Sequence, residues 1–288
     1  MKFAIIGGDD RSILLCSLLY RDGHRVHCFA LEKAELPSEI PKAGCLQGCI
    51  YGADFVILPT PAEGSGFLNA PYATEPLSMA ELTGTLWSGQ ILCGGALSRE
   101  SRLSAIQAGL CVEDLMQRRG FTVSNAAICA EGALELLMRN SRRTLWRSRV
   151  LVTGWGRIAK ILAPRLLALG AEVTVAARKE ADRAMVRALG MTATDFKAPE
   201  HLLDGFHFAV NTVPARVICD AALGNAASGI LLLELASPPG GFDRKAAESA
   251  GLNAVAGPGL PGICAPYTAA ELIREAIYEI VEEQKEDN

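Results

Sequence analysis

The sequence predicts an α/β protein of two tandem doubly wound, Rossmann-like domains, with a C-terminal helix that returns to the first domain. Its short apolar runs lie between glycine, proline or polar residues, which is typical of buried parallel strands. A strand, a glycine turn, a helix and a second strand occur twice, from Lys2 and again from Arg149, and two such βαβ openings indicate two domains. The length of 288 residues suits two domains better than one.

The first domain is expected to span residues 1–124 and to include the returning helix 267–288. Its expected elements are a strand over 2–6, a glycine turn over 7–11, a helix over 12–21 and strands over 25–31, 53–58 and 90–93. Apolar residues recur at i, i+3 and i+4 near the C-terminus, which predicts an amphipathic helix from 268 to about 283. The acidic residues 282–288 are expected to fray.

The second domain is expected over 125–266 and opens with a long interdomain helix over 125–143. Its further elements are strands over 149–153, 172–176, 208–211, 230–236 and 254–255, with a helix that ends near Leu169 after the first of them. Strands that alternate with helices in this way favour a parallel sheet.

Composition excludes several functional classes. Lys and Arg number 28 against 32 Asp and Glu, and the net charge of −4 argues against a nucleic-acid partner. No uninterrupted apolar run approaches the roughly 18 to 20 residues of a membrane span, and the immediate N-terminal strand leaves no room for a secretory signal. Nine dispersed cysteines are expected to be reduced, without a metal site, so a cytoplasmic location is predicted.

The strongest motif follows the strand at 149–153. Gly154, Gly156 and Ala159 have the spacing of a dinucleotide-binding loop that opens a helix. The first glycine makes the tight turn, the second lets the backbone approach a pyrophosphate, and the helix N-terminus attracts the phosphates. Trp155, Arg157 and Ile158 complete the expected cofactor loop, against the alternative of a purely structural glycine turn.

The end of the next strand predicts NADP in preference to NAD. An NAD site places a carboxylate there for the ribose hydroxyls, whereas this chain reads Ala177-Arg178-Lys179. Arg178 and Lys179 would attract a 2′-phosphate. The alternative is that both cations belong to a solvated turn.

Two further strand exits are expected to face the cofactor: the first contains Thr212, Val213 and Pro214, the second Ala236 and Ser237. Ligands bind at the carboxyl edge of open α/β sheets, and the glycine-rich segment 257–262 would add a third wall. The prolines of these segments could instead simply end the strands.

In the first domain, the turn at 7–11 is interpreted as a substrate loop. Arg11 can bind a carboxylate with its forked guanidinium group, and Asp9 can orient it or act as a base. The alternative is an N-cap aspartate beside a solvated arginine. The additional candidates for this cleft are Thr60, Gly94-Gly95, Asn125 and Glu131, the last of them a second candidate base.

Five arginines cluster where the long helix meets the next strand: Arg139, Arg142, Arg143, Arg147 and Arg149. A solvated helix face is the ordinary explanation of such a run, and a surface that binds a partner is the alternative.

Several motifs together resemble one known family, the A subunits of dipicolinate synthase. They are Gly-Gly-Asp-x-Arg at 7–11, Ala130-Glu131-Gly132-Ala133, Gly154-Trp155-Gly156-Arg157, Ala177-Arg178, Asn211-Thr212-Val213-Pro214, and the segments 235–241 and 258–269. The resemblance runs from Ile5 to about Ile273, and its most specific part is the last two segments. Pro238 departs from the family, which has Arg before Pro-Gly-Gly, so no substrate role carries over to this position.

The resemblance implies a sporulation enzyme of the bacterial mother cell that oxidises a dihydrodipicolinate-type dicarboxylate to pyridine-2,6-dicarboxylate with NADP. It also implies a flavoprotein-like B subunit as partner, and a homo-oligomer is possible. Arg11 and Arg157 are the hypothesised carboxylate-binding groups. Two alternatives stay open: an NADP-binding, non-catalytic partner subunit, or another two-domain NAD(P) dehydrogenase such as a shikimate- or alanine-dehydrogenase-like enzyme.

Overall fold

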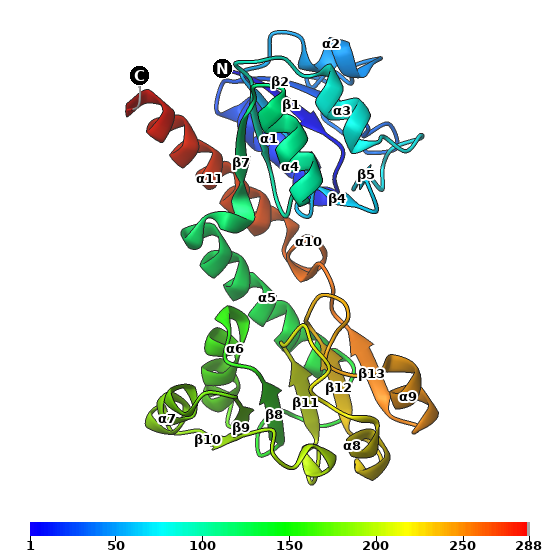
Figure 1. The fold of residues 1–288 in the computed structure, drawn as a ribbon, viewed down its shortest axis with the longest axis vertical. Helices are drawn as coiled ribbons and strands as arrows, with labels where there is room; N and C mark the ends of the chain where they lie inside the picture. Colours follow the sequence, from blue (N-terminus) through cyan, green and yellow to red (C-terminus); the bar gives the residue numbers. More distant parts are fainter. Residues whose placement is uncertain (287–288) are drawn as a thin grey trace. The chain divides into compact units, whose positions relative to one another are not determined.

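The computed structural model describes residues 1–286 and divides the chain into two compact units (Figure 1). Unit 1 contains residues 1–125 and 265–288, and unit 2 contains residues 126–264. The last two residues of the expected returning helix, 287–288, lie outside the described residues. Two doubly wound domains and a C-terminal helix that belongs to the first of them are therefore confirmed.

Unit 1 is built on a parallel five-stranded sheet with the order β2-β1-β3-β6-β7. Its strands are β1 (Lys2–Ile6), β2 (Arg25–Phe29), β3 (Phe55–Ile57), β6 (Ile91–Gly94) and β7 (Cys111–Asp114), beside the small antiparallel pair β4 (Glu63–Gly64) and β5 (Phe67–Leu68). Its helices are α1 (Asp10–Arg21), α2 (Leu46–Ile50), α3 (Met79–Thr85), α4 (Arg99–Gln107), the 3-10 turn η1 (Leu115–Gln117) and α11 (Pro266–Glu286). This is the order of flavodoxin-like folds, whose ligands bind where the strand order reverses, here between β1 and β3.

Alternating strand residues bury both faces of the unit 1 sheet. Phe3 and Ile5 belong to a core with α1 and α11, whereas Ala4 and Ile6 pack with α2, α3 and α4. The apolar stripe of α11 thus packs against α1. Helix α11 continues to Glu286, past the expected end near 283, and Arg118 binds Glu283 in its last turns.

Unit 2 is built on a parallel six-stranded sheet with the order β10-β9-β8-β11-β12-β13 (Figure 1). Its strands are β8 (Arg149–Thr153), β9 (Glu172–Ala176), β10 (Thr192–Thr194), β11 (Phe208–Asn211), β12 (Leu231–Glu234) and β13 (Asn253–Ala256). Its helices are α6 (Arg157–Ala168), α7 (Glu180–Ala188), the 3-10 turn η2 (Pro199–His201), α8 (Asp220–Asn225), α9 (Arg244–Ser249) and α10 (Leu260–Cys264). Counted within the unit, this is the 3-2-1-4-5-6 order of dinucleotide-binding folds.

The long helix α5 (Arg119–Arg139) differs from the expected helix over 125–143. It begins six residues earlier, directly after Arg118, and it ends before Asn140, where a loop leads to β8. Near its end the loop turns at Arg147, which has a positive φ of 58° and whose N–H bonds to the carbonyl of Gly170. Arg142, Arg143 and Arg147 therefore lie on this loop and not on a helix face, and Arg149 begins β8.

Within residues 1–286, α5 is the one helix long and apolar enough to span a bilayer by length and composition. This test asks only for a long helix that is apolar on average and contains few charges. It can therefore select α5 although the chain has no uninterrupted apolar run of that length. Ala130, Ala133 and Leu137 of α5 are fully buried in the core of unit 2, among residues of β8, α6 and β11. Packing of this kind is typical of the core helix of a globular domain.

Candidate functional site

The dinucleotide loop joins β8 to α6 at the carboxyl edge of the unit 2 sheet. Gly154 has a φ of 94°, and a Cβ atom at this position would lie 2.7 Å from Thr212 Oγ1 and 2.8 Å from Val213 Cγ2. The loop is therefore pressed against the exit of β11, and only glycine satisfies both the backbone angle and the space. Gly154 thus makes the tight turn that the motif predicts.

The N-terminus of α6 is open towards a ligand. Gly156 is its N-cap and offers no side chain to the first helical N–H groups. Apart from its two chain neighbours, no residue of 1–286 has an atom within 4 Å of a Cβ built there. Arg157 and Ile158 follow in the first turn, and Arg157 is exposed without an ion pair in residues 1–286. Free N–H groups, a positive helix end and an unpaired guanidinium group fit a pyrophosphate. The residues present therefore suit a dinucleotide.

A buried polar network lies behind this loop, and no motif of the sequence predicted it. Thr153, Asn211 and Glu234 end three adjacent strands and face one another in register. Thr153 Oγ1 donates to Asn211 Oδ1 at 2.5 Å, and Asn211 Nδ2 donates to Glu234 Oε1 at 2.6 Å. Thr153 and Asn211 are wholly buried. Because the network depends on which strands are neighbours, the only sequence signal was a polar residue at the end of each apolar strand.

The network also fixes the loops that leave the strands. Glu234 accepts the N–H of Ala236 at 2.9 Å and that of Gly241 at 2.7 Å, and Asn211 accepts the N–H of Val213 at 3.2 Å. A Cβ atom at Gly241 would lie 2.2 Å from the side chain of Asn211. The segments around Thr212 and Ser237 are thus held at the sheet edge as rigid turns.

A largely apolar hollow of about 230 Å³ adjoins the β12 exit within unit 2. Its lining includes Glu234, Ala236, Pro239, Phe242 and Pro258. Ala236 and Pro258 come from two of the segments expected to form cleft walls, and the structure brings them to this hollow. Thr212 and Val213 lie one strand away, beside Gly154, and Pro214 follows them in the chain.

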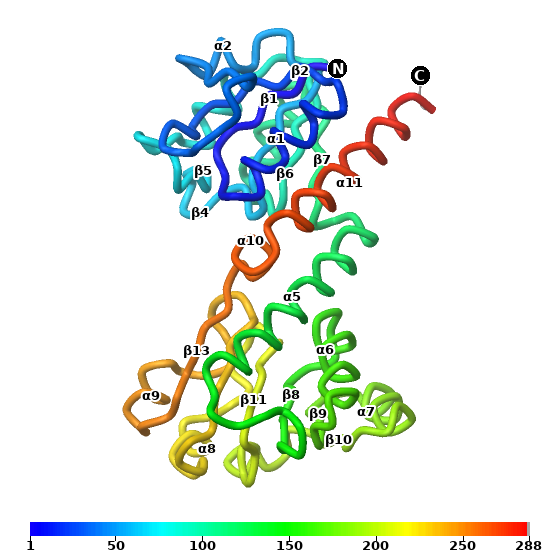
Figure 2. The backbone as a smooth tube through the Cα atoms, turned by 180° about the vertical axis from the view of Figure 1, so that it is seen from behind, coloured from blue at the N-terminus to red at the C-terminus, as the bar shows by residue number. Residues whose placement is uncertain are grey.

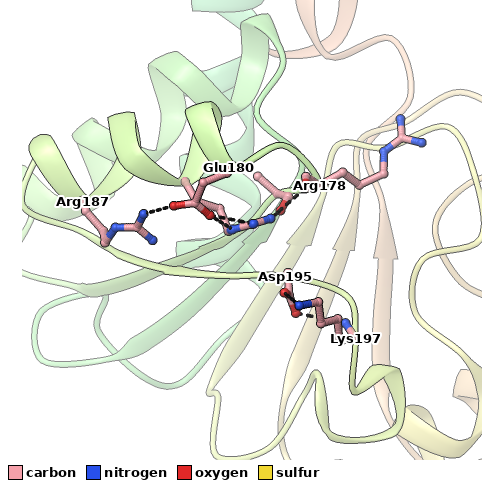
Figure 3. A network of polar contacts seen from close by, with 7 residues as sticks. Arg178, Glu180, Arg187, Asp195 and Lys197 are labelled. Atoms are coloured by element: carbon pink, nitrogen blue, oxygen red, sulfur yellow. Dashed lines mark hydrogen bonds and ion pairs between the residues drawn. The ribbon is translucent and has the colours of Figure 1, made fainter.

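The exit of β9 carries two unpaired cations. Arg178 and Lys179 are exposed, and neither forms an ion pair in residues 1–286. Figure 3 shows the Arg178 side chain directed away from the neighbouring network, in which Arg187 binds Glu180. Hydrogen bonds from Arg187 and Arg183 lower the pKa of Glu180, so this nearby carboxylate is already paired. The other acid in the first turn of α7, Asp182, is half-buried and forms no ion pair among residues 1–286.

Arg183 supports this turn, and the sequence patterns gave no indication of it. Its Nη1 donates to the carbonyls of Ala177 and Arg178, both at 2.7 Å. The guanidinium group therefore caps the end of β9 and holds the backbone that carries Arg178. Its position in the sequence, one helical turn into α7, gives no signal of this contact.

In unit 1, the loop after β1 has the geometry of a closed ion pair. Arg11 Nε donates to Asp9 Oδ1 at 2.9 Å and its Nη2 to Oδ2 at 2.7 Å, and Asp9 also caps α1 by accepting the N–H of Arg11. Burial would raise the pKa of Asp9, but the Arg11 hydrogen bonds and charge outweigh it and the pKa is lowered. Arg11 is only 6% exposed. Asp9 is thus an N-cap, but its arginine is not solvated.

Thr60 follows β3 at the same sheet edge. Its Oγ1 is buried and has no hydrogen-bond partner among residues 1–286, which is uncommon for a buried hydroxyl. The side chain covers Gly95, where a Cβ atom would lie 2.3 Å from it. Glycine at 95 therefore makes room for Thr60, and the free hydroxyl suits a hydrogen bond to a ligand.

Two other candidates lie on α5. Asn125 is half-buried, and Glu131 is exposed and pairs with Arg165 at 3.3 Å between Oε1 and Nη1. Glu131 is therefore a solvated, paired carboxylate in this structure. No group of three or more His, Cys, Asp or Glu in the described part of the chain could hold a metal ion.

The strand orders and the glycine loop define the class of the protein: a two-domain protein with the fold of the nicotinamide-dependent dehydrogenases. The structure is similar to apo D-lactate dehydrogenase from Escherichia coli, with a TM-score of 0.68, 14% identity and coverage of 99% of this chain and 97% of that chain. At this identity the likeness concerns the fold alone.

Within this class the chain resembles one particular family. Residues 2–116 match the family described as the N-terminal domain of the dipicolinate synthase A subunit. The A subunit of dipicolinate synthase from Bacillus subtilis (strain 168) is 29% identical over 289 residues, which cover 98% of this chain and 96% of that protein. The crystal structure of the dipicolinate synthase A chain from Bacillus subtilis matches with a TM-score of 0.85 and 26% identity, over 100% of this chain and 98% of that chain. The resemblance to the dipicolinate synthase A subunit that the motifs predict is thus confirmed along the whole chain.

Proposed function

We propose that this chain is the A subunit of a dipicolinate synthase and oxidises a dihydrodipicolinate-type intermediate to pyridine-2,6-dicarboxylate with NADP. The observation that carries the proposal is the glycine loop of unit 2, pressed on the β11 exit in a sheet of dinucleotide-binding order, in a chain that resembles this family throughout. The reaction removes a hydride and a proton from the ring, and NADP when bound would accept the hydride. Aromaticity favours the product, so the protein mainly has to orient and bind.

The residues of unit 2 divide the work of cofactor binding. The α6 N-terminus with Arg157 would bind the pyrophosphate, and Arg178 and Lys179 would bind the 2′-phosphate. The turns around Thr212 and Ser237, fixed by Asn211 and Glu234, would hold the nicotinamide half. The exposed state of both cations at the β9 exit supports NADP in preference to NAD.

The proposed substrate site uses the β1 and β3 exits of unit 1. Arg157 of unit 2 stays a second candidate group for a carboxylate. Since Asp9 occupies Nε and Nη2 of Arg11, a substrate carboxylate would bind the remaining Nη1 group, and Thr60 Oγ1 would donate a second hydrogen bond. Asp9 stays a candidate base, although its ion pair makes it a weak one. Glu131 stays a candidate as well.

The weak basicity of Asp9 favours one second candidate function, in which the chain binds NADP and a partner subunit completes the chemistry. Absorbance of NADPH, followed with the purified chain, fresh dihydrodipicolinate and NADP, separates the two. Turnover without the partner eliminates the second function. Turnover only with the partner supports it, and no turnover under either condition contradicts the first.

The cofactor preference has its own test in Arg178→Ala. We expect NADP affinity to fall about 10- to 100-fold while NAD affinity hardly changes, because only NADP carries the 2′-phosphate. Arg102→Ala, an exposed and unpaired arginine of α4 among residues 1–286, is the matched control. An equal loss for both cofactors, or none, would refute the role of Arg178.

An A subunit implies a partner. We propose that this partner is the flavoprotein-like B subunit and that the pair acts in the cytoplasm of the mother cell during spore formation. A gene for such a flavoprotein directly downstream of this one, transcribed only in sporulating cells, is the expected observation.

A further inference from the structure

The loop between α5 and β8 presents a positive surface that the proposed chemistry does not use. The Arg–Trp patch consists of Arg142, Arg143, Trp146, Arg147 and Arg149, all of them exposed. Because β8 begins at Arg149 and ends at Thr153, the patch lies at the amino end of this strand and the glycine loop at its carboxyl end. The path of this loop into β8 can be followed in Figure 2. The patch therefore leaves the candidate cofactor site open.

The patch has few counter-charges. No Asp or Glu occurs between Glu135 and Glu172, and none of its four arginines forms an ion pair among residues 1–286. Glu172 lies opposite Arg149 in the strand register. Glu172 and Asp204 line one hollow with Arg149, but neither carboxylate pairs with it. Guanidinium groups on one short loop repel one another within the Debye length of about 8 Å at physiological salt. An acidic partner surface would relieve that repulsion.

The neighbours of the patch respond to its charge. Arg139, just before the patch, pairs with Oε1 of Glu135, and the patch arginines form no ion pair with this glutamate. Burial, followed by the charges of Arg143 and Arg149, lowers the pKa of the adjacent His207. The histidine is therefore held in its neutral form and does not add to the positive surface.

Trp146 gives the patch a rigid aromatic anchor. The residue is 58% exposed, and its ring rests on Gly170, where a Cβ atom would lie 2.5 Å from it. The Arg147 guanidinium carbon lies 4.2 Å from the ring centroid, and Ser148 Oγ closes the loop by donating to the carbonyl of Thr144 at 2.6 Å. Tryptophan and arginine are the residues that most often dominate binding energy at protein interfaces. A preformed loop also lowers the entropy cost of binding.

We propose that the Arg–Trp patch is the docking site for an acidic face of the partner subunit. This inference rests on the proposed function, because it assumes that the chain assembles with a second, different subunit. A symmetric dimer through the patch would place arginine against arginine, which argues against a second copy. Nucleic acid is disfavoured because the chain has a net charge of −4 and these cations are confined to one loop.

The test is calorimetric titration of the full-length chain with the purified flavoprotein-like subunit. We expect Arg142→Glu combined with Arg147→Glu to weaken binding about 100-fold, since two attractive charges become repulsive. Arg99→Glu combined with Arg102→Glu, two exposed arginines of α4 without ion pairs among residues 1–286, makes the same change of charge elsewhere and should alter affinity less than about 3-fold. Trp146→Ala should weaken binding about 10- to 100-fold. Binding by the unchanged chain should also weaken as salt rises from about 0.05 M to about 0.5 M.

The remaining outcomes distinguish the partner subunit from a second copy of the chain and from DNA. They also distinguish failure of the docking site from failure of the proposed function. Equal effects of the two double variants would overturn the docking site. The docking site would also be overturned if the chain alone formed a dimer, or bound a DNA duplex, and only the patch variant lost that dimer or that binding. NADP titration of the same samples checks the fold of each variant. An unchanged chain that does not bind NADP would contradict the proposed function, whereas an unchanged chain that binds NADP but not the subunit overturns only the docking site.

Discussion

At the scale of single residues, polar side chains at the strand ends of unit 2 form hydrogen bonds that fix the backbone of the loops after the strands. Asn211 bonds both neighbours, Thr153 and Glu234, so the exits of β8, β11 and β12 form one hydrogen-bonded unit. Glu234 accepts from three N–H groups, which belong to Asn211, Ala236 and Gly241. A side chain surrounded only by donors has to be an acceptor at both of its oxygens.

The first prediction follows from that donor set. Glu234→Gln would place an amide NH₂ against at least one N–H, so we expect the free energy of unfolding to fall by about 1 to 3 kcal/mol. NADP affinity should fall as well, because the segment around Ser237 loses its anchor. Urea unfolding and cofactor titration measure both effects. Glu248→Gln on α9 is the exposed control, and equal behaviour of the two variants would contradict the role of Glu234.

The Asp9–Arg11 pair of unit 1 leads to a prediction about pH. The folded pKa of Asp9 lies below its usual value of 3.8, so the pair stabilises the fold above that pH. This contribution is lost as the pH falls from about 4 through the folded pKa. We expect Asp9→Asn to be less stable than the unchanged chain at neutral pH and to approach it below about pH 4.

Urea unfolding between neutral pH and about pH 3 checks this expectation. The control is Asp182→Asn, which replaces a partly exposed aspartate of α7. A stability difference for Asp9→Asn that stays constant over the whole range would show that the ion pair is not its cause.

At the scale of elements, the strand–loop–helix unit from β8 to α6 carries the cofactor hypothesis. Its two glycines have different physical reasons. Gly154 is required by the fold, since its φ is positive and a Cβ would strike Thr212 and Val213. Gly156 has an ordinary φ of −84° and open space around it, so only a ligand would need it to be glycine.

This difference predicts opposite behaviour of two alanine variants. Gly154→Ala should lower the free energy of unfolding by about 1 to 3 kcal/mol and abolish nucleotide binding, because the loop has to move. Gly156→Ala should leave the melting temperature nearly unchanged and weaken NADP binding about 10-fold or more, since its methyl group would lie where the pyrophosphate approaches. Thermal unfolding with and without NADP checks both variants. A stable Gly156→Ala variant with normal NADP affinity would refute the assigned site.

At the scale of the whole molecule, each unit has its own pair of cores. Both cores of unit 1 contain residues of its sheet, and one of them also contains α11 from the end of the chain. The cores of unit 2 contain residues from within 126–264. Unit 1 has more Asp and Glu than Lys and Arg, whereas unit 2 has more Lys and Arg than Asp and Glu. The unit proposed to bind a dinucleotide is thus the positive one, although the chain as a whole is acidic.

Separate cores predict two unfolding transitions in calorimetry. NADP should raise the melting temperature of unit 2 only. At a concentration of 100 times its dissociation constant, it should add about 2.7 kcal/mol to the free energy of unfolding of this unit. Dihydrodipicolinate should shift the other transition if unit 1 holds the substrate. A single transition that moves as a whole with NADP would contradict independent units.

The sequence by itself determined the fold class, the two βαβ openings, the returning helix and the family resemblance, because apolar periodicity, glycine spacing and motif order are local properties of a chain. It also indicated which residues follow the strands, and therefore Gly154, Arg178 and Thr212. Only the tertiary structure decided which of these exits are neighbours. The Thr153–Asn211–Glu234 network, the closed Asp9–Arg11 pair, the support of Arg183 and the unpaired hydroxyl of Thr60 all depend on distances between residues that no local pattern encodes. The conformation of the loop after α5 depends on such a contact as well, a backbone bond from Arg147 to the carbonyl of Gly170.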